Sequence, residues 1–455
     1  MTSPAPLPPA SEGPPRGRSD LAGPGDASTR RLRDTLAVLC AIYLVLLQTN
    51  LALALRSTVF GAIALVVLML VFRSEARADA ALSRPARAAI AAYLAWAAWS
   101  AASVGWSVAP RYSAGELWTE VLALGIGAGA ILLSVRETVV FRRYVATVLA
   151  AFGVLAAAAI ALRLTAASWN EQLMQLAHHG VGTWSTHVVI VAPLILLVRA
   201  PERAGWGTGR LPTVAAIALL VLALASARAT ENRMVWPALL ASLAVVGAAS
   251  ALRWPASGRV PIARRVIPYV LLAALLAGTL LDVSWRKAES TQAPPQSIER
   301  SVAEDPRLAI WPIVRDRIAD RPWIGYGYGK GILGPEIARE MGDPTLTHAH
   351  NAFASVWLQT GAIGLALFVA ALAAAAWRFA GYARARDDTL ALVGIAGLAI
   401  LAGVLVKNLT DDFFFRTNAR FLWTTLALLV AFGERRLRTG SENRGQTPTT
   451  PGSDP

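Results

Sequence analysis

Residues 389–406 carry the sequence TLALVGIAGLAILAGVLV, a run without any charged side chain. A helix of about 18 apolar residues is long enough to cross the hydrocarbon core of a bilayer. Runs of this kind recur along the whole chain, and each predicts a transmembrane helix. We expect such helices near residues 35–50, 52–72, 86–104, 115–134, 143–163, 181–198, 211–227, 234–252, 265–282, 351–377, 388–406 and 412–432.

The composition of the 455 residues agrees with a membrane protein, because 55% are hydrophobic and only 16% are charged. Soluble domains carry roughly 25% charged residues. Since the bilayer offers no water to the backbone, the spanning segments must be helical. We therefore predict an all-α polytopic membrane protein with about twelve transmembrane helices and one large loop. Several of these helices are rich in Ala and Gly, which favours close helix packing in lipid.

Arginines set the expected topology. The net charge of +14 does not indicate nucleic-acid binding, because most arginines fall in alternate short loops and in the two tails. The positive-inside rule places these segments in the cytoplasm, together with both termini. The arginine clusters lie within residues 16–33, 73–87, 136–143, 199–210, 253–265, 378–386 and 435–444.

The chain then divides into five parts. Residues 1–34 and 433–455 are predicted to be disordered cytoplasmic tails, the first without a cleaved signal peptide. Residues 35–282 hold helices one to nine, and residues 351–432 hold helices ten to twelve. Between them, residues 283–350 form a long loop on the non-cytoplasmic side. A single cysteine, Cys40, excludes an intramolecular disulfide.

The long loop contains two distinctive stretches. From Leu308 to Ile318, apolar side chains recur at helical spacing, which predicts an amphipathic helix on the membrane surface or over a cavity. The sequence RPWIGYGYG at residues 321–329 lacks the spacing of a phosphate-binding loop. We interpret it as a tight turn that lets the backbone approach a substrate.

The loop ends in His348-Ala349-His350-Asn351, directly before helix ten. The pair His348 and His350 has three interpretations: a metal site, helix capping, or a general base at the lipid–water boundary. No further His or acidic residue with ligand spacing accompanies the pair, so we predict no metal. We favour His350 as the base, with His348 in a supporting role.

Arg228 and Arg233 lie in a short outer turn, against the topological bias of arginines. They either snorkel to lipid headgroups or bind an anion, because guanidinium groups hold phosphate through two parallel hydrogen bonds. Arg307 in the long loop is a candidate for a second such contact. Two arginines and a histidine on the outer side suit a substrate that carries a pyrophosphate.

Together these segments resemble the signature of the O-antigen ligase and polymerase superfamily, which includes WaaL-type ligases, Wzy-type polymerases and PglL-type protein O-oligosaccharyltransferases. The matching residues are Arg307, Trp311, Pro322 to Gly327, His348 to Asn351 and Gln359 to Gly364. Trp106-Ser107, Pro110 and Ser113 resemble its first outer loop. Asn232-Arg233 and Trp236 resemble its Ser-Arg turn, with Asn232 where the family often has Ser.

The resemblance implies a GT-C-like inverting glycosyltransferase in the bacterial inner membrane that uses neither cofactor nor metal. Its donor would be a glycan on undecaprenyl diphosphate at the periplasmic face, and its acceptor a sugar hydroxyl of lipid A–core. His350 would be the catalytic base, while Arg233 and Arg307 would bind the diphosphate. His348, Arg228, Asn351 and Trp311 would support them. Membrane lipids are further partners, and nucleic acid is not.

Two alternatives within the family stay open. A polymerase differs mainly in its acceptor, whereas the short C-terminal tail disfavours a protein oligosaccharyltransferase. From another class, a transporter of lipid-linked glycans would need ionisable residues near the bilayer midplane. The predicted helix centres are almost purely apolar, since Arg56 and Lys407 lie near helix ends.

Overall fold

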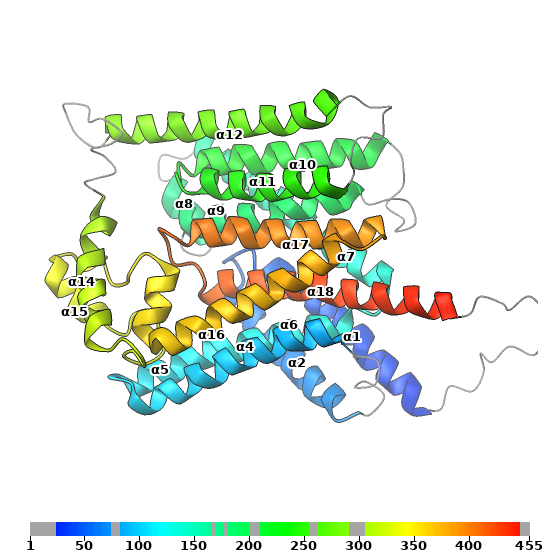
Figure 1. The fold of residues 1–455 in the computed structure, drawn as a ribbon, viewed down its shortest axis with the longest axis horizontal. Coiled ribbons are helices and arrows are strands. Elements are labelled where there is room, and N and C mark those ends of the chain that lie inside the picture. The colour runs from blue at the N-terminus through cyan, green and yellow to red at the C-terminus, as the bar shows by residue number, and fades with distance from the viewer. Residues whose placement is uncertain are drawn as a thin grey trace, which may run out of the picture.

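The computed structural model describes residues 24–73, 82–165, 169–176, 180–199, 210–253, 262–290 and 305–445. Within these ranges the chain forms helices and loops and contains no strand. Ten helical segments in this part are long and apolar enough to cross a membrane. The predicted all-α polytopic class is therefore confirmed (Figure 1).

The helices follow one another along the chain with short connections. The first part of the bundle comprises α1 (Pro24–Leu46), α2 (Leu53–Val71), α4 (Arg84–Ala102), η1 (Ser103–Trp106), α5 (Pro110–Leu117), η2 (Trp118–Leu122), α6 (Ala123–Ser134), α7 (Thr138–Thr165), α8 (Trp169–Leu176), α9 (Val181–Val191) and η3 (Ala192–Arg199). The second part comprises α10 (Arg210–Ala229), α11 (Val235–Arg253), α12 (Ile262–Ser290), α14 (Pro306–Asp320), α15 (Gly334–Met341), α16 (Ala352–Ala383), α17 (Asp388–Lys407) and α18 (Arg416–Gly445).

Three helices run past their predicted ends. α1 begins at Pro24 and α18 continues to Gly445, so residues 24–34 and 433–445 are helical where disorder was predicted. α12 runs to Ser290, beyond the predicted end at residue 282. Hydropathy reports only the part of a helix that lies in lipid, whereas backbone hydrogen bonding continues through residues of good helix propensity. The rest of both tails lies outside the described residues.

Two of the twelve predicted membrane helices, 35–50 and 412–432, are not among the ten candidate spans of the described residues. They correspond to α1 and α18. α1 carries Arg30, Arg31, Arg33 and Asp34 ahead of its apolar part, and α18 begins with Arg416. The predicted number of spans is therefore not confirmed, although both segments are helical.

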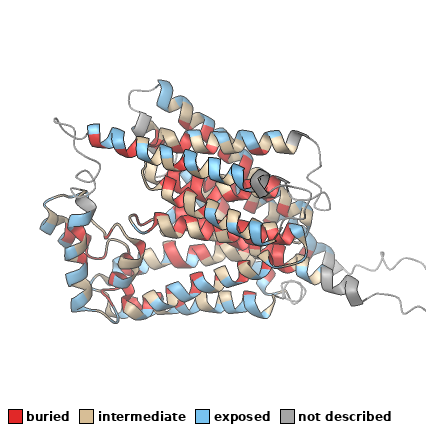
Figure 2. Cartoon of the chain, turned by 45° about the horizontal axis from the view of Figure 1, so that its top comes forward, coloured by how far each residue is buried: buried red, intermediate tan, exposed pale blue. Residues whose placement is uncertain are grey.

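α17, which contains the run 389–406, lies in the middle of the bundle (Figure 1) and is largely buried. Buried residues gather at the centre of the bundle (Figure 2). Its glycines allow its neighbours to approach closely. A Cβ atom at Gly394 or Gly397 would collide with α16, and one at Gly403 would collide with Ser242 of α11. The Gly- and Ala-rich sequence thus packs α17 tightly between these helices, as small residues do in membrane bundles.

α16 is kinked at Gly361, where φ is 70° and the helical hydrogen bonding is interrupted. The backbone of the glycine-rich loop fills the break. The Ala362 N–H donates to the Pro322 carbonyl (2.8 Å), and the indole of Trp99 donates to the Thr360 carbonyl (2.9 Å). Backbone groups freed within a membrane helix need such partners. Helix ten is therefore two helical segments and not the single helix that we predicted.

α14 and α15 lie together at one end of the bundle, whereas the start of α1 and the end of α18 project at the opposite end (Figure 1). Ile310 and Val314 of α14 are buried against Ile337 of α15 and Leu358 of α16. The helix predicted at 308–318 is thus confirmed, and Ile310 and Val314 lie on its buried side. Its apolar face packs on protein, and the long segment 305–350 is a compact cap on the bundle.

Candidate active site

The segment His348 to Asn351 is fixed at both sides by hydrogen bonds from distant parts of the chain. The indole Nε1 of Trp311 on α14 donates to the Ala349 carbonyl (3.1 Å). The amide Nδ2 of Asn351 donates to the Leu409 carbonyl in the α17–α18 loop (2.9 Å). Since a histidine lies on each side of Ala349, these contacts fix the backbone that carries both imidazoles.

Asn351, and neither histidine, caps α16. Its Oδ1 accepts hydrogen bonds from the backbone N–H groups of Phe353 and Ala354, each at 3.0 Å. This is the usual role of Asn at a helix N-terminus. The interpretation of His348 and His350 as capping residues is therefore wrong.

His350 has a backbone conformation that is unusual for a residue with a side chain, with φ at 48°. In the described part of the chain, only Glu231 and Arg416 share this feature among non-glycine residues. Such conformations cost about 1–3 kcal/mol and cluster at functional sites. The rings of His348 and His350 lie 4.0 Å apart between centroids. The fold thus holds two imidazoles in close contact, with their planes tilted by 36°, at the start of a membrane helix.

The metal interpretation gains no support from the described residues. Among them, no group of three or more His, Cys, Asp or Glu side chains could hold a metal ion. His178 and His179 lie outside the described residues. That transfer needs no metal stays a prediction.

The turn that carries Arg233 is built by short polar side chains. Asn232 accepts from the Met234 N–H through Oδ1 (2.9 Å), and the hydroxyl of Thr230 accepts from the Asn232 N–H (3.3 Å). Ser and Asn both form turns of this kind. The Asn at position 232, where the family often has Ser, therefore serves the same local purpose and places Arg233 at the start of α11.

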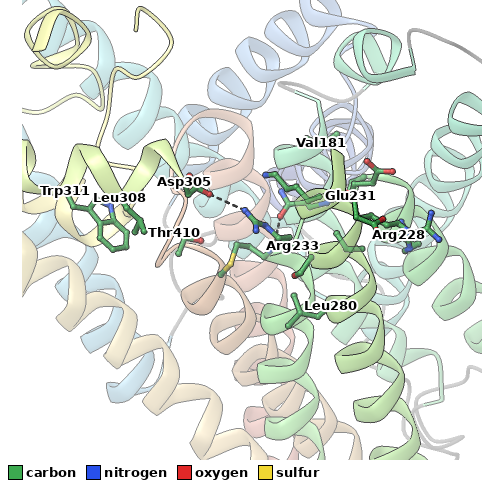
Figure 3. Close-up of a pocket in the computed structure, with 17 residues that line it drawn as sticks. Val181, Arg228, Glu231, Arg233, Leu280, Asp305, Leu308, Trp311 and Thr410 are labelled. Carbon is green, nitrogen blue, oxygen red and sulfur yellow. Dashed lines mark hydrogen bonds and ion pairs between the residues drawn. The ribbon is translucent and has the colours of Figure 1, made fainter. Parts of the chain in front are cut away.

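A cavity of about 860 Å³ opens beside this turn (Figure 3). Three of the predicted site residues line it, namely Arg228, Arg233 and Trp311. His348, His350 and Asn351 are not among the residues that line it. Their segment is hydrogen-bonded to Trp311, which lines the cavity, and to Leu409, whose neighbour Thr410 lines it. Arg307 begins α14 beside the cavity, and its side chain lies outside the described part of the structure.

The two arginines of the turn are engaged differently. Arg228 forms a salt bridge with Asp282 of α12 at 2.6 Å, with 32% of its side chain exposed. Arg233 is only 15% exposed and contacts Asp305 at 3.3 Å. Its Nη1 is buried and has no hydrogen-bond partner among the described residues. Figure 3 shows Arg233 directed toward Asp305 at the foot of α14.

Two basic residues at this cavity escaped the sequence reasoning. Arg286 and Lys287 of α12 line it together with Arg233. They follow the apolar run of helix nine on the outer side, where basic residues are uncommon, and this exception to the positive-inside pattern was the available signal. Their helix extends past its predicted end, which brings both side chains to the cavity.

The glycine-rich stretch 321–329 is a tight loop whose glycines pack against protein, and its approach to a substrate stays a prediction. Gly325, Gly327 and Gly329 all have positive φ, and a Cβ at each would collide with protein. The colliding atoms belong to the backbone near Gln359, to Ser107 and to Tyr112, respectively. The glycines let the loop lie against the first outer loop and the kink of α16.

Hydrogen bonds complete this contact. The N–H of Gly327 donates to the Gln359 carbonyl (2.8 Å), and that of Gly329 donates to the Gln359 side chain (3.0 Å). The N–H of Tyr328 donates to the hydroxyl of Ser103 (3.0 Å). The segments 103–113, 321–329 and 359–364, which the sequence links only by resemblance, thus form one unit that supports the cap.

Lys330 ties this unit to the loop that also holds the histidine segment. Its Nζ donates to the Asp412 carbonyl (2.8 Å) and lies 3.5 Å from the ring centroid of Phe415. Removal of its ammonium group from water lowers the pKa of Lys330. The carbonyl and the aromatic ring replace part of the lost solvation.

The arrangement can bind an anion and move a proton within one region. The guanidinium groups that line the cavity, with Arg233 the most shielded from solvent, favour a phosphate or diphosphate. An imidazole on the segment that is hydrogen-bonded to Trp311 of this cavity can accept a proton from a hydroxyl group bound next to it.

Comparison with known proteins agrees with this chemistry. A family model described as O-Antigen ligase matches residues 218–369. The match runs from α10 to the first half of α16 and includes both arginines of the turn, Trp311, the two histidines and Asn351. It is narrower than the resemblance in sequence, since it leaves out the first outer loop. No match was found among curated proteins.

Proposed function

We propose that this protein is an O-antigen ligase, because a family model described as O-Antigen ligase matches residues 218–369. It transfers a glycan from undecaprenyl diphosphate to a sugar hydroxyl of lipid A–core. The reaction takes place at the periplasmic face of the bacterial inner membrane, with both chain termini in the cytoplasm.

One observation carries the proposal. The cavity joins a partly unsatisfied, mostly buried Arg233 to Trp311, and Trp311 holds the backbone between His348 and His350. An anion-binding side chain and a potential base are thus mounted on the same small set of elements. A lipid scaffold protein would use the arginines but would leave the strained conformation of His350 without a purpose.

The diphosphate of the donor binds in the cavity of Arg233. Arg307 supplies a second guanidinium, and Arg286 and Lys287 add positive charge from α12. As the bond to the sugar breaks, negative charge grows on the leaving diphosphate. Preorganised cationic donors stabilise such charge more strongly in the transition state than in the ground state.

His350 activates the acceptor. Its imidazole takes the proton of the attacking sugar hydroxyl, whose oxygen then bonds to the anomeric carbon. The bond between that carbon and the diphosphate oxygen breaks at the same time, and the electron pair leaves with undecaprenyl diphosphate. Attack from the face opposite the leaving group inverts the anomeric configuration.

Complementation tests the proposal. The gene is expressed in one strain that lacks its ligase and in another that lacks its polymerase, and lipopolysaccharide is separated on gels. A ligase restores the whole ladder of glycan lengths on lipid A–core in the first strain. Extension of a single repeat in the second strain alone would instead identify a polymerase. Movement of labelled lipid-linked glycan across vesicles without transfer would identify a transporter.

A further inference from the structure

The loop that fills the kink of α16 carries large apolar side chains on its outer surface. Trp323 is 68% exposed and Ile324 is 41% exposed. Trp357 and Ile363 of α16 are exposed beside them, and both are bonded to the loop. The indole of Trp357 donates to the Pro322 carbonyl (2.9 Å), and the N–H of Ile363 donates to the Trp323 carbonyl (3.4 Å). Trp323, Ile324, Trp357 and Ile363 therefore form one apolar patch.

The backbone beneath this patch has its hydrogen-bond acceptors satisfied by protein. Each carbonyl group of residues 322–324 accepts at least one hydrogen bond from a neighbouring segment. The donors are the N–H groups of Ala362 and Ile363 and the indoles of Trp106 and Trp357. An irregular loop with unpaired carbonyls could not enter an apolar medium without a large cost in free energy. These contacts remove that cost for the three carbonyls.

The lengths of two membrane helices place the patch at a boundary of the bilayer. Beyond the kink at Gly361, α16 continues for 22 residues to its end, which is about 33 Å at 1.5 Å per residue. This length matches a hydrocarbon core of about 30 Å. The kink therefore lies where the hydrocarbon ends on the side of the cap. α4 and η1 form a second span, which ends at Trp106 in contact with the same loop.

The side chains around the patch have the chemistry of that boundary. Tryptophan concentrates where hydrocarbon meets headgroups, and Trp99 and Trp106 lie next to the loop with their ring centroids 5.3 Å apart. Arg321, directly before the apolar residues, is exposed, and its guanidinium lies 4.8 Å from the ring centroid of Tyr326. An arginine beside exposed apolar groups can contact lipid phosphates while its stem covers apolar surface.

We propose that residues 321–324 bind the phospholipid bilayer in the leaflet on the side of the cap. Trp323 and Ile324 insert among the acyl carbons nearest the headgroups, and Arg321 lies at the level of the phosphates. The patch is continuous with α16, whose exposed side chains face lipid over the rest of the span. The cap is thereby held at a fixed depth. This binding does not depend on which reaction the protein catalyses.

Fluorescence quenching in phospholipid vesicles tests the proposal on the full-length protein. In a Cys40→Ala background, Trp323→Cys is labelled with a thiol-reactive fluorophore. The side chain at this position is mostly exposed, so its replacement leaves the packing intact. The vesicles contain lipids with a nitroxide either near the headgroup end or near the methyl end of the acyl chain. The nitroxide near the headgroup should quench the label more strongly, and aqueous iodide should quench it weakly.

Two control positions calibrate the depth. Glu336→Cys, at an exposed position of α15 in the cap, should be quenched by iodide and by neither nitroxide. Val369→Cys, at a 44% exposed position farther along α16, should be quenched most by the nitroxide near the methyl end.

Two outcomes would overturn the proposal. A label at position 323 that iodide quenches as strongly as the label at position 336 would place the loop in water. A label protected from iodide and from both nitroxides would show that protein, such as a second copy of the chain, covers the patch. Should Trp323→Cys fail to fold, Ile324→Cys should show the same order of quenching, and the same two outcomes would count against the proposal.

Discussion

Arg228 and Arg233 come from the same turn, yet the structure gives them different surroundings. The guanidinium of Arg228 is satisfied by Asp282 at 2.6 Å and remains 32% exposed. Arg233 is more deeply buried, and its Nη1 has no partner among the described residues. A cation in this state gains more from an incoming phosphate than one that is already paired. The resemblance in sequence implies that Arg233 binds the diphosphate with Arg228 in support, and the contacts favour the same assignment.

We therefore expect Arg233→Ala to reduce glycan transfer roughly a hundredfold, or about 3 kcal/mol, as for other lost contacts to a developing charge. Arg233→Lys should restore little, because an ammonium group cannot form two parallel hydrogen bonds. Initial rates with purified protein and lipid-linked donor measure the effect. Arg228→Ala is the matched control and should lose less than tenfold. A larger loss in the control would assign the diphosphate to Arg228.

Asp305 occupies the position of a ligand, because its carboxylate contacts Arg233 at 3.3 Å in the cavity. A donor diphosphate must displace it. Asp305→Asn removes the competing charge, and donor affinity should rise about threefold, in line with the modest energy of partly exposed ion pairs. Binding of labelled donor is the measurement. The matched control is Glu289→Gln, which also removes one negative charge from the cavity wall but at another position. Weaker binding in Asp305→Asn alone would show that Asp305 positions Arg233.

At the scale of the helices, the sequence predicts most of what the structure contains. Apolar runs locate the membrane helices, and the spacing of Ile310 and Val314 locates α14. Helix ends are less predictable, because the end of an apolar run is not the end of hydrogen bonding. The kink at Gly361 is also hidden, since it depends on the backbone of residues 322–324, which lies far away in the sequence.

The kink provides a test of how the glycine-rich loop supports the cap. Gly361 has a positive φ, and a Cβ there would collide with the Trp323 carbonyl. Gly361→Ala should lose about 1–3 kcal/mol of stability and most of its transfer activity, as measured by thermal melting and initial rates. Gly278→Ala, where nothing lies within 4 Å of the added Cβ, should be neutral. An active and stable Gly361→Ala variant would contradict this role.

On the scale of the whole molecule, two cavities lie at opposite ends of the bundle, one beside the cap and one beside the chain ends. The walls of the first cavity come mainly from the turn between α10 and α11, from α12 and from α14, whose residues are distant in the sequence. Patterns along the chain therefore revealed Arg233 and Trp311 through their motifs, but not Arg286 and Lys287. These residues surround the same cavity only because of how the helices pack, and the sequence pattern does not predict that packing.

The proposed orientation has a direct consequence for chemical labelling. Glu336 on α15 and Arg84 at the start of α4 are both exposed, at opposite ends of the bundle. In a Cys40→Ala background, cysteine at position 336 should react with an impermeant thiol reagent in intact spheroplasts. Cysteine at position 84 should react only after lysis. The reverse pattern would invert the topology and place the candidate site in the cytoplasm.

The central claim is that His350 accepts the proton of the acceptor hydroxyl, and the single-turnover transfer rate of His350→Asn tests it most directly. Asn tolerates positive φ, so it keeps the backbone at 48° while removing the base. With donor bound to the purified protein, we predict a fall of about two to four orders of magnitude. Donor affinity should be unchanged, and His348→Asn should keep partial activity. A His350→Asn variant that transfers glycan at the parent rate would contradict the account.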